Sequence, residues 1–304
     1  MPCKEVLARM GKRATGALLL GPSLLLLTAF LVLPILFTVW VSLHSWDMLT
    51  PIGSMPWAAG ANVQQLLTDP VFLAALRNTL LYAVGTAAIV IPLAVGLGLL
   101  LGPSRLRGAG TVRALLFLPY VIPNVAVAIV WGYILAPIYG PANALLQTLG
   151  IPAQAWLGAP REALASILLL NVWQTLGYYT VIVIAGLAEI PTDVHEAARI
   201  DGARWWQATW HVTLPLLRRA LGFLIVILSI NTLQVFAPVY ILTQGGPINS
   251  TQTIVYHMWV TAFSYLQMGP ASMMALVLLI VVLIVTYFEL RMLGTVRRQR
   301  PEGG

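Results

Sequence analysis

The sequence predicts an all-α integral membrane protein with six transmembrane helices. Three observations lead to this prediction: a scarcity of charge, six long apolar runs, and basic residues gathered on one side of those runs. Of the 304 residues, 59% are hydrophobic and 9% are charged, whereas soluble domains carry about 25% charged residues. So few charges could not cover a soluble fold of this size, so lipid is the expected solvent.

Each apolar run reaches the length of about 20 residues that a membrane-spanning helix needs. The runs cover residues 17–43, 79–101, 114–136, 163–188, 220–242 and 271–290. The first run is much longer than the apolar core of a signal peptide, about 7–15 residues, so we expect it to be retained. The expected organisation is an N-terminal segment (1–16), a membrane domain (17–292) and a C-terminal tail (293–304).

The basic residues predict the orientation of these spans. Fifteen of the 17 Lys and Arg residues lie in the N-terminal segment, in the loops after the second and fourth runs, and at the C-terminal end. Arg77 and Arg161 lie on the opposite side. Because Lys and Arg concentrate on the cytoplasmic side of a membrane, both termini are predicted to be cytoplasmic, which six spans allow.

Prolines interrupt several of the runs. A proline in a span leaves backbone groups that neighbouring helices or a water-filled cavity must satisfy. This pattern favours a packed bundle that lines a pathway, although any single proline could also form a simple kink. The prolines concerned are Pro22, Pro34, Pro92, Pro119, Pro123 and Pro238.

Charge is nearly absent from the interior of the runs, and this bears on function. No Asp, Glu, Lys, Arg or His lies near the middle of any run. A proton-coupled carrier or a membrane enzyme would need such groups, and no metal-ligand set is present. The net charge of +7 lies between the runs, which fits a membrane surface rather than nucleic acid. The energy for any transport is therefore expected from another protein.

The loop between the fourth and fifth runs, residues 190–219, is long for such a connection. Asp193 is predicted to cap a short amphipathic helix that starts at Val194. Gly202 would end that helix in a tight bend, and Pro215 would mark the entry to the next span. The periodicity alone also fits a helix that lies on the lipid surface.

This loop carries a motif with fixed spacing. It consists of Glu196, Ala197, Ala198, Asp201, Gly202, Val212, Leu214 and Pro215. The pattern resembles the EAA loop of binding-protein-dependent ABC importer permeases, in which isoleucine usually stands in place of Val212. The Asp before the glycine is similar to the carbohydrate-uptake branch of that family. The segment LTQGGP at 242–247, and Asn78 with Thr79, are similar to the first permease of its maltose-type members.

The resemblance implies a transporter subunit that is not an enzyme by itself. Its partners would be a second permease of different sequence, two ATP-binding subunits that hold ATP and Mg²⁺, and an extracytoplasmic solute-binding protein. The chain would lie in a bacterial or archaeal plasma membrane, hold no cofactor, and move a sugar by alternating access. The residues implied to couple it to the ATPase are Glu196, Ala197, Ala198, Asp201, Gly202, Leu214 and Pro215.

Polar and aromatic residues inside the spans are candidates for contact with solute. They are Asn171, Trp173, Gln174 and Tyr178 in the fourth run, and Asn231 and Gln234 in the fifth. In maltose-type permeases, residues that match Asn171, Trp173 and Tyr178 contact sugar. The amides of the fifth run are offset by one position from that pattern. All six residues could instead form hydrogen bonds between helices.

Two other functions stay open at this point. The same importer class could carry a glycerol-phosphate-type anion, but the spans lack the buried Lys or Arg that such a solute favours. A secondary transporter would instead draw on an ion gradient, and sodium could use carbonyl oxygens alone.

Overall fold

The computed structural model describes residues 12–102 and 108–292. Within them the chain is helical and forms no strand; the one β-type pairing there is an isolated bridge between His44 and Trp57. The chain contacts divide it into two compact units, one made of residues 1–68 with 260–276 and the other of residues 69–259 with 277–304. Most of the predicted terminal segments, 1–11 and 293–304, lies outside the described residues.

The first unit holds the first span and the segments that follow it. Its elements are α2 (Lys12–Leu27), η1 (Thr28–Val32), α3 (Leu33–Ser42), η2 (Ile52–Ser54), α4 (Ala59–Thr68), η5 (Val260–Ser264) and the start of α16 (Met268–Met292). The buried side-chain amide of Asn62 donates to the carbonyls of Ser42 and His44 at 2.8 and 3.0 Å. Gly269 packs against the same carbonyl of His44, where a Cβ would lie only 2.1 Å away.

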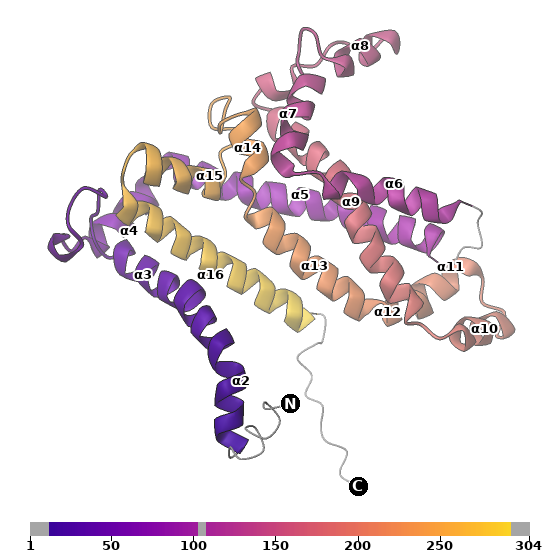
Figure 1. Cartoon of the computed structure of the whole chain (residues 1–304). Coiled ribbons are helices and arrows are strands. Elements are labelled where there is room, and N and C mark those ends of the chain that lie inside the picture. Colours follow the sequence, from indigo (N-terminus) through magenta and orange to yellow (C-terminus); the bar gives the residue numbers. More distant parts are fainter. Residues whose placement is uncertain (1–11, 103–107, 293–304) are drawn as a thin grey trace, which may run out of the picture. The chain divides into compact units, whose positions relative to one another are not determined.

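The second unit forms the larger bundle (Figure 1). Its helices, in chain order, are α5 (Pro70–Leu101), α6 (Ala109–Val121), α7 (Asn124–Ile134), α8 (Pro141–Thr148), η3 (Trp156–Gly158), α9 (Ala163–Ala188), α10 (Thr192–Ile200), α11 (Trp205–Ala208), η4 (Thr209–Thr213), α12 (Leu214–Leu216), α13 (Arg218–Leu233), α14 (Ala237–Leu242) and α15 (Ile254–Trp259). Its core lies where α5, α9 and α13 pack together, around Val90, Tyr179 and Leu224.

Within the described residues, five helices are long and apolar enough to cross a membrane, and a sixth span is present if a bent pair of helices is counted as one. The bent pair is α6 and α7, whose axes differ by 97°. The sequence predicts one continuous span over 114–136, so the structure corrects its shape. The cause is local: Ile122 is extended, as the residue before a proline usually is, and Pro123 cannot continue the ladder of N–H donors.

The second span also starts earlier than the apolar run. Helix α5 begins at Pro70 rather than at residue 79. Asp69 precedes it, and one carboxylate oxygen of Asp69 accepts the N–H of Val71 at 2.8 Å. Proline at the first helical position and an acidic cap are both strong start signals, so the helix extends beyond the purely apolar part of the sequence.

Candidate functional site

Beyond the C-terminal end of α9, the segment 190–219 forms α10, a tight turn, and then the consecutive elements α11, η4 and α12 (Figure 1). Helix α10 ends at Ile200, and Gly202 adopts a left-handed conformation with φ of +76°. The N–H of Gly202 donates to the carbonyl of Arg199, and the N–H of Ala203 donates to that of Ala198. These two bonds form a Schellman cap, so the bend predicted at Gly202 is confirmed.

The start of α10 differs from the prediction. The helix begins at Thr192 after Pro191, and no side chain caps it. Asp193 therefore lies in the first turn instead of serving as the cap. Pro191 sets the boundary because its fixed φ and lack of an N–H suit a position just before a helix. Asp193 in the first turn and Arg199 in the last still complement the helix dipole.

The predicted coupling residues divide into an exposed and a packed group. Glu196 and Ala197 are exposed on α10, and Ala198 is buried. Helix α10 packs on α11 and η4, so Ala198 faces the protein while its two neighbours face outward. Because Ala197 has such a small side chain, another backbone could approach α10 closely beside the carboxylate of Glu196.

The aromatic residues of this segment add a large apolar surface. Trp205, Trp206 and Trp210 are 76%, 50% and 67% exposed, and Ile200 is 85% exposed. Helix α11 begins with a bond from the backbone N–H of Arg204 to the side-chain oxygen of Gln207 at 2.8 Å. Such an exposed apolar cluster is typical of a surface that a protein partner or lipid covers.

The segment is anchored to the core of the second unit at both ends. Ile190 and Leu214 pack against the core cluster, and Leu217 is a fully buried member of it. Gly186 lets α9 and α13 cross closely, because a Cβ there would lie 2.4 Å from the Cβ of Ala220. A displacement of α10 would therefore be passed to packed side chains rather than absorbed by a loose loop. Pro215, in contrast, is exposed.

Three of the four solute candidates on α9 contact the bent pair. The side-chain amide of buried Gln174 donates to the Asn124 side chain at 2.8 Å and to the Ile122 carbonyl at 3.3 Å. The Tyr178 ring stacks on Tyr120 with centroids 4.3 Å apart and planes at 9°. These contacts bring together residues about 50 positions apart, at the point where α6 ends and α7 begins.

The remaining candidates vary in their surroundings. Trp173 is 43% exposed and lies 5.5 Å from the Trp131 ring of α7, centroid to centroid. The side-chain oxygen of Asn171 is buried with no hydrogen-bond partner among the described residues. Asn231 is exposed and donates to the hydroxyl of Tyr179 at 3.4 Å. Gln234 is exposed at the gap between α13 and α14.

The structure adds residues to this region that the sequence reasoning missed. They are Tyr120, Asn124 and Tyr179, which contact Tyr178, Gln174 and Asn231. A usable signal was present, since Tyr120 and Asn124 each directly follow one of the two prolines that break the third run. Polar residues beside a break can line a pathway or satisfy its freed backbone groups.

The Asn78–Thr79 pair bonds to the chain that directly follows the segment 242–247. The side-chain amide of Asn78 donates to the carbonyls of Asn249 and Gln252 at 2.9 and 3.1 Å. The hydroxyl of Thr79 accepts the N–H of Ile254 at 3.0 Å. Both residues of α5 therefore hold the chain that follows the glycines against the second span.

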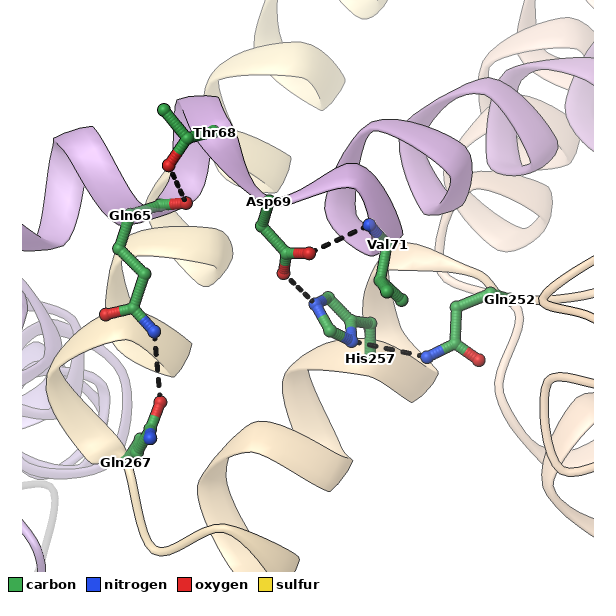
Figure 2. Close-up of polar contacts among 7 residues, drawn as sticks. All are labelled: Gln65, Thr68, Asp69, Val71, Gln252, His257 and Gln267. Carbon is green, nitrogen blue, oxygen red and sulfur yellow. Dashed lines mark hydrogen bonds and ion pairs between the residues drawn. The ribbon is translucent and has the colours of Figure 1, made fainter.

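A buried histidine makes a further link to the start of α5 (Figure 2). His257 Nε2 lies 2.9 Å from the second carboxylate oxygen of Asp69, and its Nδ1 lies 3.2 Å from the side-chain nitrogen of Gln252. Because Gln252 donates to Nδ1, a neutral ring carries its proton on Nε2 and donates it to Asp69. Asp69 thus caps α5 and holds α15 at the same time.

Comparisons with known proteins agree on one family. The profile described as "Binding-protein-dependent transport system inner membrane component" matches residues 94–294. The trehalose/maltose transport system permease of Thermococcus litoralis is 31% identical, over 94% of each chain. The diacetylchitobiose uptake system permease of Streptomyces coelicolor is 32% identical, over 87% of this chain and 78% of the relative.

A solved structure has the same fold. It is a chain of a bacterial ABC transporter involved in the import of the acidic polysaccharide alginate, and it superposes with a TM-score of 0.79. The match covers 93% of this chain and 95% of the other, at 22% sequence identity.

Proposed function

This chain belongs to the binding-protein-dependent transport system inner membrane component family, and from that premise we propose that it forms half of the pathway of an ATP-driven sugar importer. The family consists of membrane transport components, not enzymes. The other half would be a second permease. Two ATP-binding subunits would hold ATP and Mg²⁺, and a solute-binding protein would deliver the sugar from outside. The membrane is the plasma membrane of a bacterium or archaeon.

The geometry of α10 is the observation that carries the coupling role. Glu196 and Ala197 are exposed beside a Schellman-capped bend, and the segment is anchored in the core through Leu217. We assign contact with the ATPase to the exposed face of α10. The small residues of that face would allow the ATPase to approach the helix closely. Closure of the ATP-binding subunits would move α10 and repack α9 against α13, which opens the pathway by alternating access.

The orientation follows from the basic residues. The segment 190–219 and both termini are assigned to the cytoplasm, because the loops on that side hold nearly all Lys and Arg residues. The segment that contains α8 and the one that contains α15 are assigned to the outside, where the solute-binding protein would dock.

A sugar is the solute that the relatives and the pathway residues favour. The named relatives transport trehalose, maltose or diacetylchitobiose. The contacts around the bent pair combine amides with the aromatic rings of Trp173 and Tyr178, and this combination suits hydroxyl groups and sugar faces. A glycerol-phosphate-type anion is less suited, because those contacts include no Lys or Arg.

The coupling role is tested in the importer assembled with its ATPase. Gly202→Pro removes the N–H of the Schellman cap and forbids the positive φ. Glu196→Lys reverses the exposed charge. We expect both variants to lose the ATPase on purification, and uptake into vesicles to fall at least tenfold.

A matched control is available at the end of α8. Gly150 has φ of +71° and lies in the same kind of cap: its N–H donates to the carbonyl of Gln147, and the N–H of Ile151 donates to that of Leu146. Gly150→Pro should keep the ATPase at the normal ratio. Normal ATPase binding and uptake in both coupling variants would refute the role of α10. Uptake by the permeases alone, driven by an ion gradient, would instead establish a secondary transporter.

A further inference from the structure

A groove runs along α9 from its N-terminal end, apart from the coupling segment and the bent pair. It has a volume of about 490 Å³. One end is lined by the polar or amphipathic side chains Trp156, Arg161 and Glu162, and the other by the apolar side chains Ile89, Leu169 and Val172. The lining thus changes from polar to apolar along the helix axis.

The polar end is held in place by hydrogen bonds. The backbone N–H of Trp156 donates to Glu162 Oε2 at 2.8 Å, and its indole N–H donates to the side-chain oxygen of Asn143 at 2.8 Å. Asn143 is 3% exposed and donates in turn to the carbonyls of Pro137 and Gln154, both at 2.9 Å. The loop therefore presents Trp156 in one fixed position.

Arg161 is left with a free charge at this end. Its neighbour Glu162 is engaged by Trp156, and Arg161 forms no ion pair within residues 12–102 and 108–292. The side chain is exposed. A guanidinium offers several N–H donors in a planar fork, and this geometry matches a phosphate group.

The length of the groove matches one leaflet of a bilayer. Helix α9 is one of the candidate spans. From Glu162 to Val172 the chain advances ten residues, or about 15 Å at 1.5 Å per residue. This is half of a hydrocarbon core about 30 Å thick. Trp156 then lies at the depth where tryptophan collects, at the interface of water and lipid.

We propose that this groove binds an anionic glycerophospholipid of the outer leaflet, with its phosphate on Arg161 and one acyl chain along Ile89 and Leu169. A sugar would place its hydroxyl groups against those apolar side chains, whereas an acyl chain would bury the side chains against its own apolar surface. The choice of the outer leaflet rests on the orientation proposed above. The binding of lipid does not depend on that orientation, so a failure of the lipid proposal can be distinguished from a failure of the proposed function.

The test uses the complete importer in nanodiscs that contain equal amounts of phosphatidylglycerol and phosphatidylcholine. Native mass spectrometry counts the lipids that each complex retains. Arg161→Gln should weaken retention of phosphatidylglycerol about ten- to hundredfold, the effect of losing a charged hydrogen bond. Ala165→Phe, which fills the groove, should remove the retained lipid altogether. Arg77→Gln changes the other predicted outward arginine and should have no effect.

Three results would overturn the proposal. Wild-type retention of phosphatidylglycerol in Arg161→Gln would remove the phosphate contact, and wild-type retention in Ala165→Phe would remove the acyl-chain site. Loss of the second permease from either variant would show that the groove is a subunit interface instead.

Discussion

At the scale of single residues, the two bonds of Gln174 satisfy groups that the bend between α6 and α7 leaves open. One acceptor is the Ile122 carbonyl, which precedes Pro123, and the other is the side chain of Asn124. Since Gln174 is only 3% exposed, water does not readily replace these bonds. A positioning role for Gln174 therefore competes with the solute contact expected from the sequence.

Replacing Gln174 by leucine separates the two roles. Gln174→Leu removes two part-buried hydrogen bonds, so we expect a loss of about 1–3 kcal/mol in the free energy of unfolding, at about 0.5–1.5 kcal/mol per bond. This is read from thermal or SDS unfolding of the purified protein. Thr175→Val is the control, because the Thr175 hydroxyl bonds only to the carbonyl of Asn171 in its own helix.

The opposite pattern would assign Gln174 to the solute. In that case Gln174→Leu would unfold like the wild type while the KM for uptake rose at unchanged yield.

Local rules predicted some of these residues well. The bend at Gly202 could be predicted because a left-handed residue at a helix end is a property of a few neighbouring positions. The partner of Gln174 could not be predicted from such local rules, because Asn124 lies 50 positions away and only the folded chain brings the two residues together. The preference of Asp for the capping position predicted a helix start after Asp193, but the helix begins directly after Pro191, so Asp193 lies in the first turn.

At the scale of elements, α6 and α9 approach each other closely at Gly177. A Cβ on Gly177 would lie 1.8 Å from the carbonyl oxygen of Leu116 and 2.2 Å from its carbon. Both atoms belong to the backbone of α6, so they cannot turn aside as a flexible side chain would. The position of the bent pair against α9 thus depends on the missing side chain.

Gly177→Ala should force α6 away from α9. We expect it to lower the free energy of unfolding by about 1–3 kcal/mol, the usual cost of overpacking, and to reduce uptake by loosening the Tyr120–Tyr178 stack. Gly96→Ala is the matched control, because Gly96 also lies within a helix but is exposed with no atom within 4 Å of an added Cβ. That variant should be neutral or slightly stabilised. Equal unfolding of the two variants would contradict the close contact.

The sequence predicts which segments are helical better than it predicts their shape. Apolar length alone located every candidate span, because a bilayer leaves the backbone little alternative to a helix. It did not predict the 97° angle of α6 and α7, since two prolines fit a mild kink equally well. It also missed the extension of α5 to Pro70, because a capped helix can continue through polar residues outside the apolar run.

At the scale of the whole molecule, the spans differ in how much of their surface the chain itself covers. In the most apolar stretch of α9, 44% of the residues are buried, whereas in that of the span Leu19–Ser42 only 6% are buried. A helix exposed to that extent needs lipid or another subunit around it. These neighbours are not encoded in one chain, so its sequence predicts the spans but not what surrounds them.

The orientation is a property of the whole chain and can be tested directly. Cys3 is the only cysteine, so Cys3→Ser gives a background for single labels. Thr148 at the end of α8 and Arg199 at the end of α10 are both exposed. With α10 in the cytoplasm, a membrane-impermeant maleimide should label Thr148→Cys in intact cells, and Arg199→Cys only after the membrane is opened.

The labelling result also bears on coupling, because an ATPase in the cytoplasm can reach only what faces it. The positive-inside rule acts through individual basic residues near the span ends, and Arg77 and Arg161 are the only two that are predicted to lie on the opposite side. Labelling of Arg199→Cys in intact cells would place α10 outside. The exposed face of Glu196 and Ala197 would then need a different partner, while the helical fold and the packing at Gly177 would stand unchanged.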